Sequence, residues 1–154
     1  MAIRVYADTS VYGGVFDREF QQPSRQFFSL VRAGRFELVA SALVEDELAY
    51  APKDVRHWFD QMQDVTDRVV ISTDAIRLRR AYLAAGIVTA KSLTDALHVA
   101  IASVSGCSLI VSWNFKHIVH FEKVPLYNAA NVLHRWPELE IRSPAEVIED
   151  DQDE

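Results

Sequence analysis

The sequence contains few cysteines and no long apolar segment, and each absence excludes a class of protein. Cys107 is the single cysteine, so neither an internal disulfide nor a cysteine-based zinc site can form. No apolar run approaches the roughly 20 residues that span a bilayer, and the first residues lack the pattern of a signal peptide. The adjacent glycines Gly13 and Gly14 belong to neither a P-loop nor a dinucleotide-binding loop. We therefore expect a cytoplasmic protein without a membrane segment.

The charge of the chain is unevenly distributed. The formal net charge is −6, which argues weakly against a broad nucleic-acid-binding surface. Residues 149–154 contribute five acids and no base, and the charge without them is −1. Acid runs of this kind are typical of solvated, disordered tails. We expect one domain over residues 1–148 and a disordered acidic tail over residues 149–154, so an anionic substrate would need a bound cation or a local basic patch.

Segments typical of strands alternate with segments at helical spacing. Strands are predicted at residues 3–7, 36–40 and 108–111, with an edge strand at 123–127 because Pro125 lies within it. Helices are predicted at residues 23–33, 42–50, 54–63, 74–85 and 94–104, with a short one within 141–148. This alternation favours an α/β fold with a parallel sheet covered on both faces. Residues 42–85 show no clear strand, and we expect a helical hairpin that projects from the sheet.

Three acids and an amide fall where the carboxyl ends of such strands meet the amino ends of the helices. Asp8 and Asn114 follow the first and third strands, Glu47 lies on the helix after the second, and Asp95 begins the apolar helix. Open parallel sheets bind ligands at this edge. Gathered carboxylates raise one another's pKa, and a hard cation such as Mg²⁺ or Mn²⁺ removes the repulsion. Such a metal activates water and polarises a phosphoryl group, which suits phosphodiester hydrolysis.

Each of these residues also has an ordinary explanation. Asp8 can cap the turn after its strand, Glu47 can be a solvent-exposed helix residue, and Asn114 can be a turn residue. Asp95 stands three residues after Ser92, which matches a capping box. The prediction of a site therefore depends on the joint placement of the four residues.

The order and spacing of these motifs resemble PIN-domain ribonucleases, especially the VapC-like toxins of toxin–antitoxin pairs. The matching pieces are residues 7–10, Ser41 followed six residues later by Glu47, residues 95–100 and residues 111–115, within a resemblance that spans most of residues 3–148. It implies a PIN-like three-layer α/β/α sandwich on a central parallel sheet with a helical hairpin insertion. It also implies an acidic Mg²⁺ site that cleaves RNA, and a homodimer.

Carried over by position, the resemblance makes Asp8, Glu47 and Asp95 the metal-binding acids. Ser10 would support Asp8 or contact the substrate. Glu45 and Asp46 are neighbours of Glu47, but residues one or two positions away on a helix point elsewhere. We interpret the chain as a metal-dependent endoribonuclease, the toxin of a two-component system, in which Asn114 and Ser112 assist. The partner would be a small antitoxin whose basic or apolar segment covers the acidic edge.

One position departs from the family pattern, because the family usually has an aspartate where this chain has Asn114. An amide brings no charge, so we expect one firmly held ion. The departure keeps open a second interpretation, a catalytically weakened PIN-like module that acts in RNA binding or protein interaction. A haloacid-dehalogenase-type phosphatase would need an acid where Ser10 stands, and a receiver domain would need an early acidic pair.

Other side chains near these motifs have two interpretations each. His98 either touches a phosphate or a metal-bound water, or is a satisfied histidine in a partly buried helix. Lys116, His117 and His120 either form a basic edge that binds substrate or are ordinary surface residues. Trp113 either stacks on a base or is a core or rim aromatic.

Overall fold

Five parallel strands form the centre of the protein, and helices connect them. The structure is a computed structural model and describes residues 2–153. The strands follow the order β3-β2-β1-β4-β5, and each neighbouring pair is parallel. The elements are β1 Ile3–Ala7, α1 Thr9–Gly14, α2 Gln21–Arg32, β2 Phe36–Ser41, α3 Ala42–Leu48, α4 Lys53–Gln61, the 3₁₀ turn η1 Gln63–Val65, β3 Thr66–Val69, α5 Thr73–Ala84, the 3₁₀ turn η2 Ala90–Ser92, α6 Leu93–Val104, β4 Leu109–Val111, α7 Lys123–Leu133, β5 Glu140–Arg142 and α8 Pro144–Asp153.

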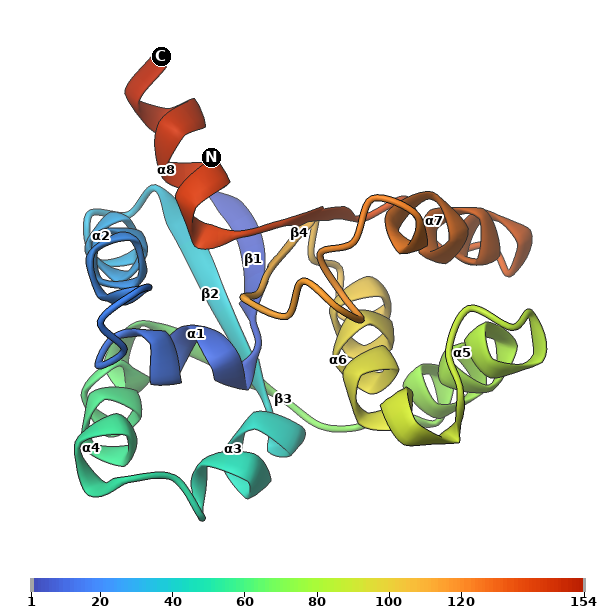
Figure 1. The fold of residues 1–154 in the computed structure, drawn as a ribbon, viewed down its shortest axis with the longest axis horizontal. Helices are drawn as coiled ribbons and strands as arrows, with labels where there is room; N and C mark the ends of the chain where they lie inside the picture. The colour runs from blue at the N-terminus through green and yellow to red at the C-terminus, as the bar shows by residue number, and fades with distance from the viewer. Residues whose placement is uncertain (1, 154) are drawn as a thin grey trace.

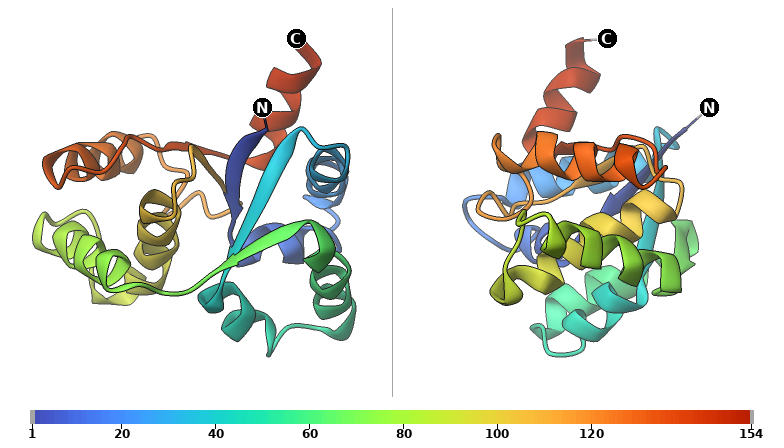
Figure 2. Two further views of the ribbon diagram at one scale, coloured as in Figure 1. Left: turned by 180° about the vertical axis from the view of Figure 1, so that it is seen from behind. Right: turned by 90° about the vertical axis from the view of Figure 1, so that its right-hand side faces the viewer.

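Helices cover both faces of this sheet. On one side lie α1, α2 and α4, with α8 packed against α2, and on the other lie α5, α6 and α7 (Figure 1). The reverse and side views in Figure 2 show the same division. The predicted three-layer α/β/α sandwich on a parallel sheet is therefore confirmed. Within the described residues, no helix has the length and apolar character that crossing a membrane requires.

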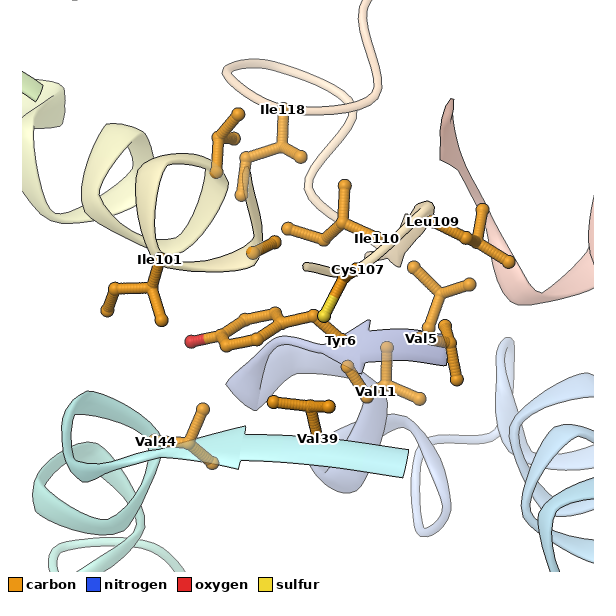
Figure 3. Close-up of a cluster of buried hydrophobic side chains, with 14 of the residues drawn as sticks. Val5, Tyr6, Val11, Val39, Val44, Ile101, Cys107, Leu109, Ile110 and Ile118 are labelled. Atoms are coloured by element: carbon orange, nitrogen blue, oxygen red, sulfur yellow. The ribbon is translucent and has the colours of Figure 1, made fainter. Parts of the chain in front are cut away.

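The last three residues of the central strand β1, Val5, Tyr6 and Ala7, are buried on both faces of the sheet, as their apolar sequence favours. Val5 lies opposite Leu38 of β2 and Leu109 of β4. Figure 3 shows the core around β1, where the Tyr6 side chain extends from the strand toward the helix that carries Ile101. Because parallel strands share a direction, the residues that follow β1, β2 and β4 come out at one edge of the sheet.

Cys107 lies in this core as well (Figure 3). Burial raises the pKa of its thiol to about 12. The thiol therefore stays protonated at neutral pH, as expected for a structural cysteine rather than a nucleophile.

The interior of the chain contains a strand where we predicted only helices. β3 interrupts residues 42–85 and pairs with β2 at the edge of the sheet, so the predicted helical hairpin is wrong in this form. The strand was missed because its central residues, Asp67 and Arg68, are polar and face solvent. Asp67 forms an ion pair with Arg4 of β1 at 2.8 Å, which ties this edge to the centre of the sheet.

The predicted edge strand at residues 123–127 is also wrong, because these residues begin helix α7. Pro125 falls in the first turn of that helix, where a backbone N–H has no intrahelical acceptor and its absence costs nothing. The other edge of the sheet is instead formed by β5, which has three residues and pairs with β4.

The predicted disordered tail is wrong for residues 149–153, which continue helix α8. Ser143 and Glu146 form a capping box at its start, because Glu146 N donates to Ser143 Oγ at 3.3 Å and Ser143 N donates to Glu146 Oε1 at 3.1 Å. Asp151 then forms an ion pair with Arg35 at 2.5 Å. The acids that suggested a solvated tail therefore lie on a docked helix, and residue 154 lies outside the described part.

Candidate functional site

Asp8 occupies the end of β1, and the fold buries it. Only 4% of the residue is exposed. Its Oδ1 accepts hydrogen bonds from Ser10 N at 3.1 Å and Ser10 Oγ at 2.5 Å, and its Oδ2 accepts one from Ser112 Oγ at 2.6 Å. Burial raises the pKa of Asp8 above its usual value, although His98 and the two serine hydroxyls oppose the rise. Asp8 is thus a desolvated carboxyl group supported by Ser10 and Ser112, as predicted for Ser10.

Glu47 comes to the same edge from α3. Ser41 ends β2 and caps this helix, because its Oγ accepts from Val44 N at 3.3 Å. Glu47 Oε1 accepts hydrogen bonds from Thr9 Oγ1 at 2.8 Å and from His98 Nε2 at 2.5 Å. Burial acts to raise the pKa of Glu47, but these bonds outweigh it and the net shift is downward. Glu47 is therefore held as a carboxylate beside the end of β1.

The neighbours of Glu47 on the helix face elsewhere, as expected. Glu45 forms an ion pair with Arg68 of β3 at 2.5 Å, and Asp46 is exposed. Of the three adjacent acids, only Glu47 contacts the residue that follows Asp8.

A chain of hydrogen bonds runs from the core to Glu47. The Tyr6 hydroxyl lies 2.8 Å from Ser41 Oγ and 2.7 Å from His98 Nδ1. Burial raises the pKa of Tyr6 well above its usual value, so the residue stays a phenol. Since the Glu47 carboxylate only accepts, His98 Nε2 donates to it. In the neutral ring Nδ1 accepts from the Tyr6 hydroxyl, and in the protonated ring Nδ1 donates to it. In both forms the bonds join Ser41, Tyr6, His98 and Glu47 in one chain.

This chain decides between the two interpretations of His98. The residue is 3% exposed, and both ring nitrogens have partners within the protein. His98 is the satisfied histidine of the second interpretation, and its role is to orient Glu47. The sequence shows His98 one helical turn after Asp95, but nothing in it indicates that Tyr6, Thr9 and Ser41 are its companions.

Asp95 lies in the first turn of α6, one turn before His98. It is half-buried, and within the described residues its carboxylate has neither a hydrogen bond nor an ion pair. The alternative of a capping box with Ser92 is wrong, because Ser92 Oγ bonds the backbone of Thr89 in η2 instead. The charge of Asp95 reaches α7, since it adds to the effect of burial in raising the pKa of Tyr127.

Asn114 closes the site after β4 and behaves as a turn residue. Its Oδ1 accepts from His117 N at 2.9 Å, and its backbone N donates to Ser112 Oγ at 2.9 Å. Ser112 thereby links Asn114 to Asp8. Lys116 is exposed on the same turn.

The donors at this edge suit a hard cation by their chemistry. Within residues 2–153, no three side chains of the His, Cys, Asp and Glu types stand close enough together to enclose a metal ion. Mg²⁺, however, is usually held by only one or two protein carboxylates together with water and phosphate oxygens. Glu47 Oε2 and the Asp95 carboxylate have no hydrogen-bond donor among the described residues. The arrangement therefore fits an open, water-rich cation site better than a closed cage.

A cleft of about 790 Å³ lies at the opposite edge of the sheet, where Ser108 and Leu139 precede β4 and β5. Glu138, Glu140 and Glu146 line this cleft, but all three are exposed. We place the candidate site at the carboxyl edge because Asp8 and Glu47 are withdrawn from solvent there and held by hydrogen bonds.

The fold relates this chain to a known structure, although sequence comparison does not. No protein-family model matches the chain, and no curated protein is similar to it in sequence. A chain of the crystal structure of VapBC2 from Rickettsia felis, bound to a DNA fragment from their promoter, matches with a TM-score of 0.57. The identity is 15%, over 80% of this chain and 94% of that chain. The fold is PIN-like. This likeness confirms the predicted fold. Any argument about the chemistry of the chain has to come from its own side chains.

Proposed function

We propose that this PIN-like chain is a metal-dependent endoribonuclease that hydrolyses RNA phosphodiester bonds in the cytoplasm. The observation that carries the proposal is the meeting of three elements at one edge. The loop after β1 presents Asp8 and Thr9, α3 presents Glu47, and α6 presents His98, one turn after Asp95. Carboxylates with their own dedicated donors, at the edge where parallel sheets bind ligands, are suited to hold a cation against a phosphate.

Mg²⁺ or Mn²⁺ is the cofactor that this donor set favours, since all of the candidate ligands are oxygens. In the proposal, Asp8, Glu47 and Asp95 hold the ion. A bound ion of this type lowers the pKa of water and polarises a phosphoryl oxygen. Glu47 would use Oε2, because Thr9 and His98 already occupy Oε1.

The remaining polar groups would act on the substrate and on the acids. Ser10 and Ser112 keep the Asp8 carboxylate oriented by the bonds described above. The partly exposed Ser10 would contact a phosphate that approaches Asp8, whereas the buried Ser112 would act through Asp8. Lys116 would neutralise a neighbouring phosphate. Asn114 would orient a water through its amide while holding the turn.

The partner we propose is a small antitoxin that covers the acidic edge with a basic or apolar segment. The matching solved structure is named as a VapBC2 complex on promoter DNA, which supports a two-component system by analogy. We also propose a homodimer. Leu126, Val132 and Leu133 of α7 are apolar and largely exposed, as expected for a helix that packs against another chain.

A second candidate function is a PIN-like module with little catalysis. Asn114 favours it, because its Oδ1 is engaged by His117 N and adds no charge at the edge. Such a module would bind RNA or a protein without cleaving.

Cleavage of labelled RNA in Mg²⁺ or Mn²⁺ tests the main proposal. We expect Asp8→Asn and Asp95→Asn each to lower the cleavage rate by more than the about 10- to 100-fold typical of outer-shell changes. Asp74→Asn is the matched control for Asp95, because Asp74 also lies in the first turn of a helix. Unchanged cleavage in both site variants would reject the mechanism. Metal binding without cleavage by the native chain would favour the second candidate.

A further inference from the structure

The segment between β4 and α7 combines aromatic and basic side chains. We call residues 113–121 the β4–α7 loop. The chain has 22 acids, yet none lies between Asp95 and Glu122. The aromatic and basic residues of the loop are Trp113, Phe115, Lys116, His117, His120 and Phe121. Rings interleaved with cations form the usual surface for single-stranded nucleic acid, where bases stack and phosphates are neutralised.

Two rings of the loop face solvent rather than the core. Phe115 is 49% exposed and Phe121 is 82% exposed. The Phe115 ring meets Trp113 edge to face, with centroids 6.1 Å apart, and the Phe121 ring stacks on His120 at 5.2 Å. Each exposed ring is therefore oriented by a neighbour and leaves a face open.

Trp113 anchors the loop beside the acids. Its indole stacks on Phe20 with centroids 4.2 Å apart, and its Nε1 donates to the buried Ser24 Oγ at 2.9 Å. Its backbone N donates at 2.9 Å to Ser10 Oγ, which itself bonds Asp8 at 2.5 Å. Two hydrogen bonds, through Ser10, therefore connect the backbone N of Trp113 to the Asp8 carboxylate, and Phe115 lies two residues after Trp113.

The backbone of the loop is ordered without any ligand. Ile118 N and Val119 N both donate to Asn114 O, at 3.1 Å and 2.8 Å. His117 O accepts from the Tyr127 hydroxyl at 2.8 Å. A surface already fixed in place loses little conformational entropy on binding, which favours affinity.

We propose that the β4–α7 loop binds the unpaired bases of single-stranded RNA next to the bond that is cleaved. Phe115 stacks on one base, Phe121 stacks on a base farther along, and Lys116 pairs with a phosphate. This inference rests on the proposed function for its choice of RNA. It adds the surface that receives the bases, which must be unpaired because the bases of a duplex are stacked on one another and leave no face for Phe115.

The loop chemistry favours RNA over a protein partner. Residues 113–121 themselves contain no acid, and the exposed Lys116 lies between the exposed rings of Phe115 and Phe121. This combination suits the bases and phosphates of a nucleic acid better than an apolar protein surface does.

The test measures binding of a labelled, unstructured ten-nucleotide RNA to the full chain in EDTA, so that no cleavage occurs. We expect Phe115→Ala to weaken binding about tenfold, within the range that stacking of one base contributes. Phe115→Trp should stay within about twofold of the native chain, because it keeps a stacking ring. Leu83→Ala is the matched control, since Leu83 is an apolar side chain on α5 with 40% exposure, close to that of Phe115.

Two changes of the probe and the salt separate stacking from general apolar contact. An abasic RNA should bind the native chain and the Phe115→Ala variant with about the same weak affinity. In both complexes the stacked pair of Phe115 and base is missing. Lys116→Gln should lower the slope of log affinity against log salt by about 0.7, the value for one phosphate on a single strand. The variants at Phe115 and Lys116 should keep the melting temperature of the native chain, since both of these side chains are exposed.

Each outcome decides one of the two proposals. The loop proposal is overturned if Phe115→Ala binds RNA as the native chain does, or if its only defect is lost binding of a protein partner. If Asp8→Asn abolishes cleavage and Phe115→Ala leaves RNA affinity intact, the nuclease stands and the loop fails. If nothing cleaves RNA but Phe115→Ala weakens binding, the nuclease fails and the loop stands.

Discussion

The hydrogen bond from Ser112 to Asp8 gives a prediction whose size depends on pH. Ser112 is fully buried, and its Oγ donates to Asp8 Oδ2 at 2.6 Å while accepting from Asn114 N at 2.9 Å. Ser112→Ala removes a bond to a charged group, about 1.5–3 kcal/mol, and one between neutral groups, about 0.5–1.5 kcal/mol. We expect the free energy of unfolding to fall by about 2–4 kcal/mol at neutral pH.

Acidification should reduce this loss. The hydroxyl of Ser112 lowers the pKa of Asp8 against the larger, opposite effect of burial. Ser112→Ala therefore raises that pKa further. Above both pKa values the variant lacks a bond to a carboxylate, whereas below both the carboxyl group is protonated in both proteins and the charged part of the difference vanishes. The difference in stability should shrink as the pH falls toward the raised pKa of Asp8.

Ser103→Ala is the matched control for this experiment. Ser103 is also buried, and its Oγ donates to Val99 O at 2.8 Å and accepts from Asn131 Nδ2 at 2.9 Å. Both partners are neutral, so the loss of about 1–2 kcal/mol should not change with pH. Urea unfolding of the three proteins from pH 8 down to pH 3.8, the usual pKa of an aspartate, includes the raised pKa of Asp8. A cost of Ser112→Ala that is constant over this range would refute the assignment of Asp8 as a buried carboxylate.

Three further substitutions test other parts of the site. Tyr6→Phe leaves His98 Nδ1 without its hydrogen-bond partner, and urea unfolding should show that the free energy of unfolding falls by about 1–3 kcal/mol. A fall of less than about 0.5 kcal/mol would mean that this bond contributes nothing to stability. Asn114→Asp adds a carboxylate to the edge, so calorimetry should show Mn²⁺ binding several-fold tighter, and unchanged affinity would place residue 114 outside the cation site. Gly14→Ala sets a methyl group 2.7 Å from Trp113 Nε1, and thermal unfolding should reveal a loss of about 1–3 kcal/mol, whereas a native melting temperature would show that the indole moves freely.

The parts of the fold that were predicted correctly are those with strong local signals. The mainly apolar segment of β1 and the glycines after three helices mark elements whose sequences admit one interpretation. Gly34, Gly86 and Gly106 all adopt positive φ, as expected for helix ends. The two edge strands carried no such signal, because β3 is polar and β5 has three residues. Their pairing depends on the neighbouring strand, which a local pattern does not contain.

The residues of the candidate site also differ in how far the sequence alone predicts their positions. The catalytic roles of Asp8, Glu47 and Asp95 stay predictions. The positions of Asp8 and Glu47 at one edge were predictable, because Asp8 follows β1 and Glu47 lies on the helix after β2. Their partners were not, since the bond from His98 to Glu47 joins residues 51 positions apart. Only the packing of α6 against the sheet brings that pair together. The prediction of a strand where α7 begins is wrong because Pro125 is typical of an edge strand and equally of a first helical turn.

The position of Tyr6 couples the interior of the sheet to its chemistry. Its ring fills the core, and its hydroxyl is one bond away from both the cap of α3 and the histidine that steadies Glu47. A repacking of β1 against α6 that preserves volume and hydrophobicity would still rotate this phenol. Selection for thermal robustness in this region would therefore act on the candidate site as well.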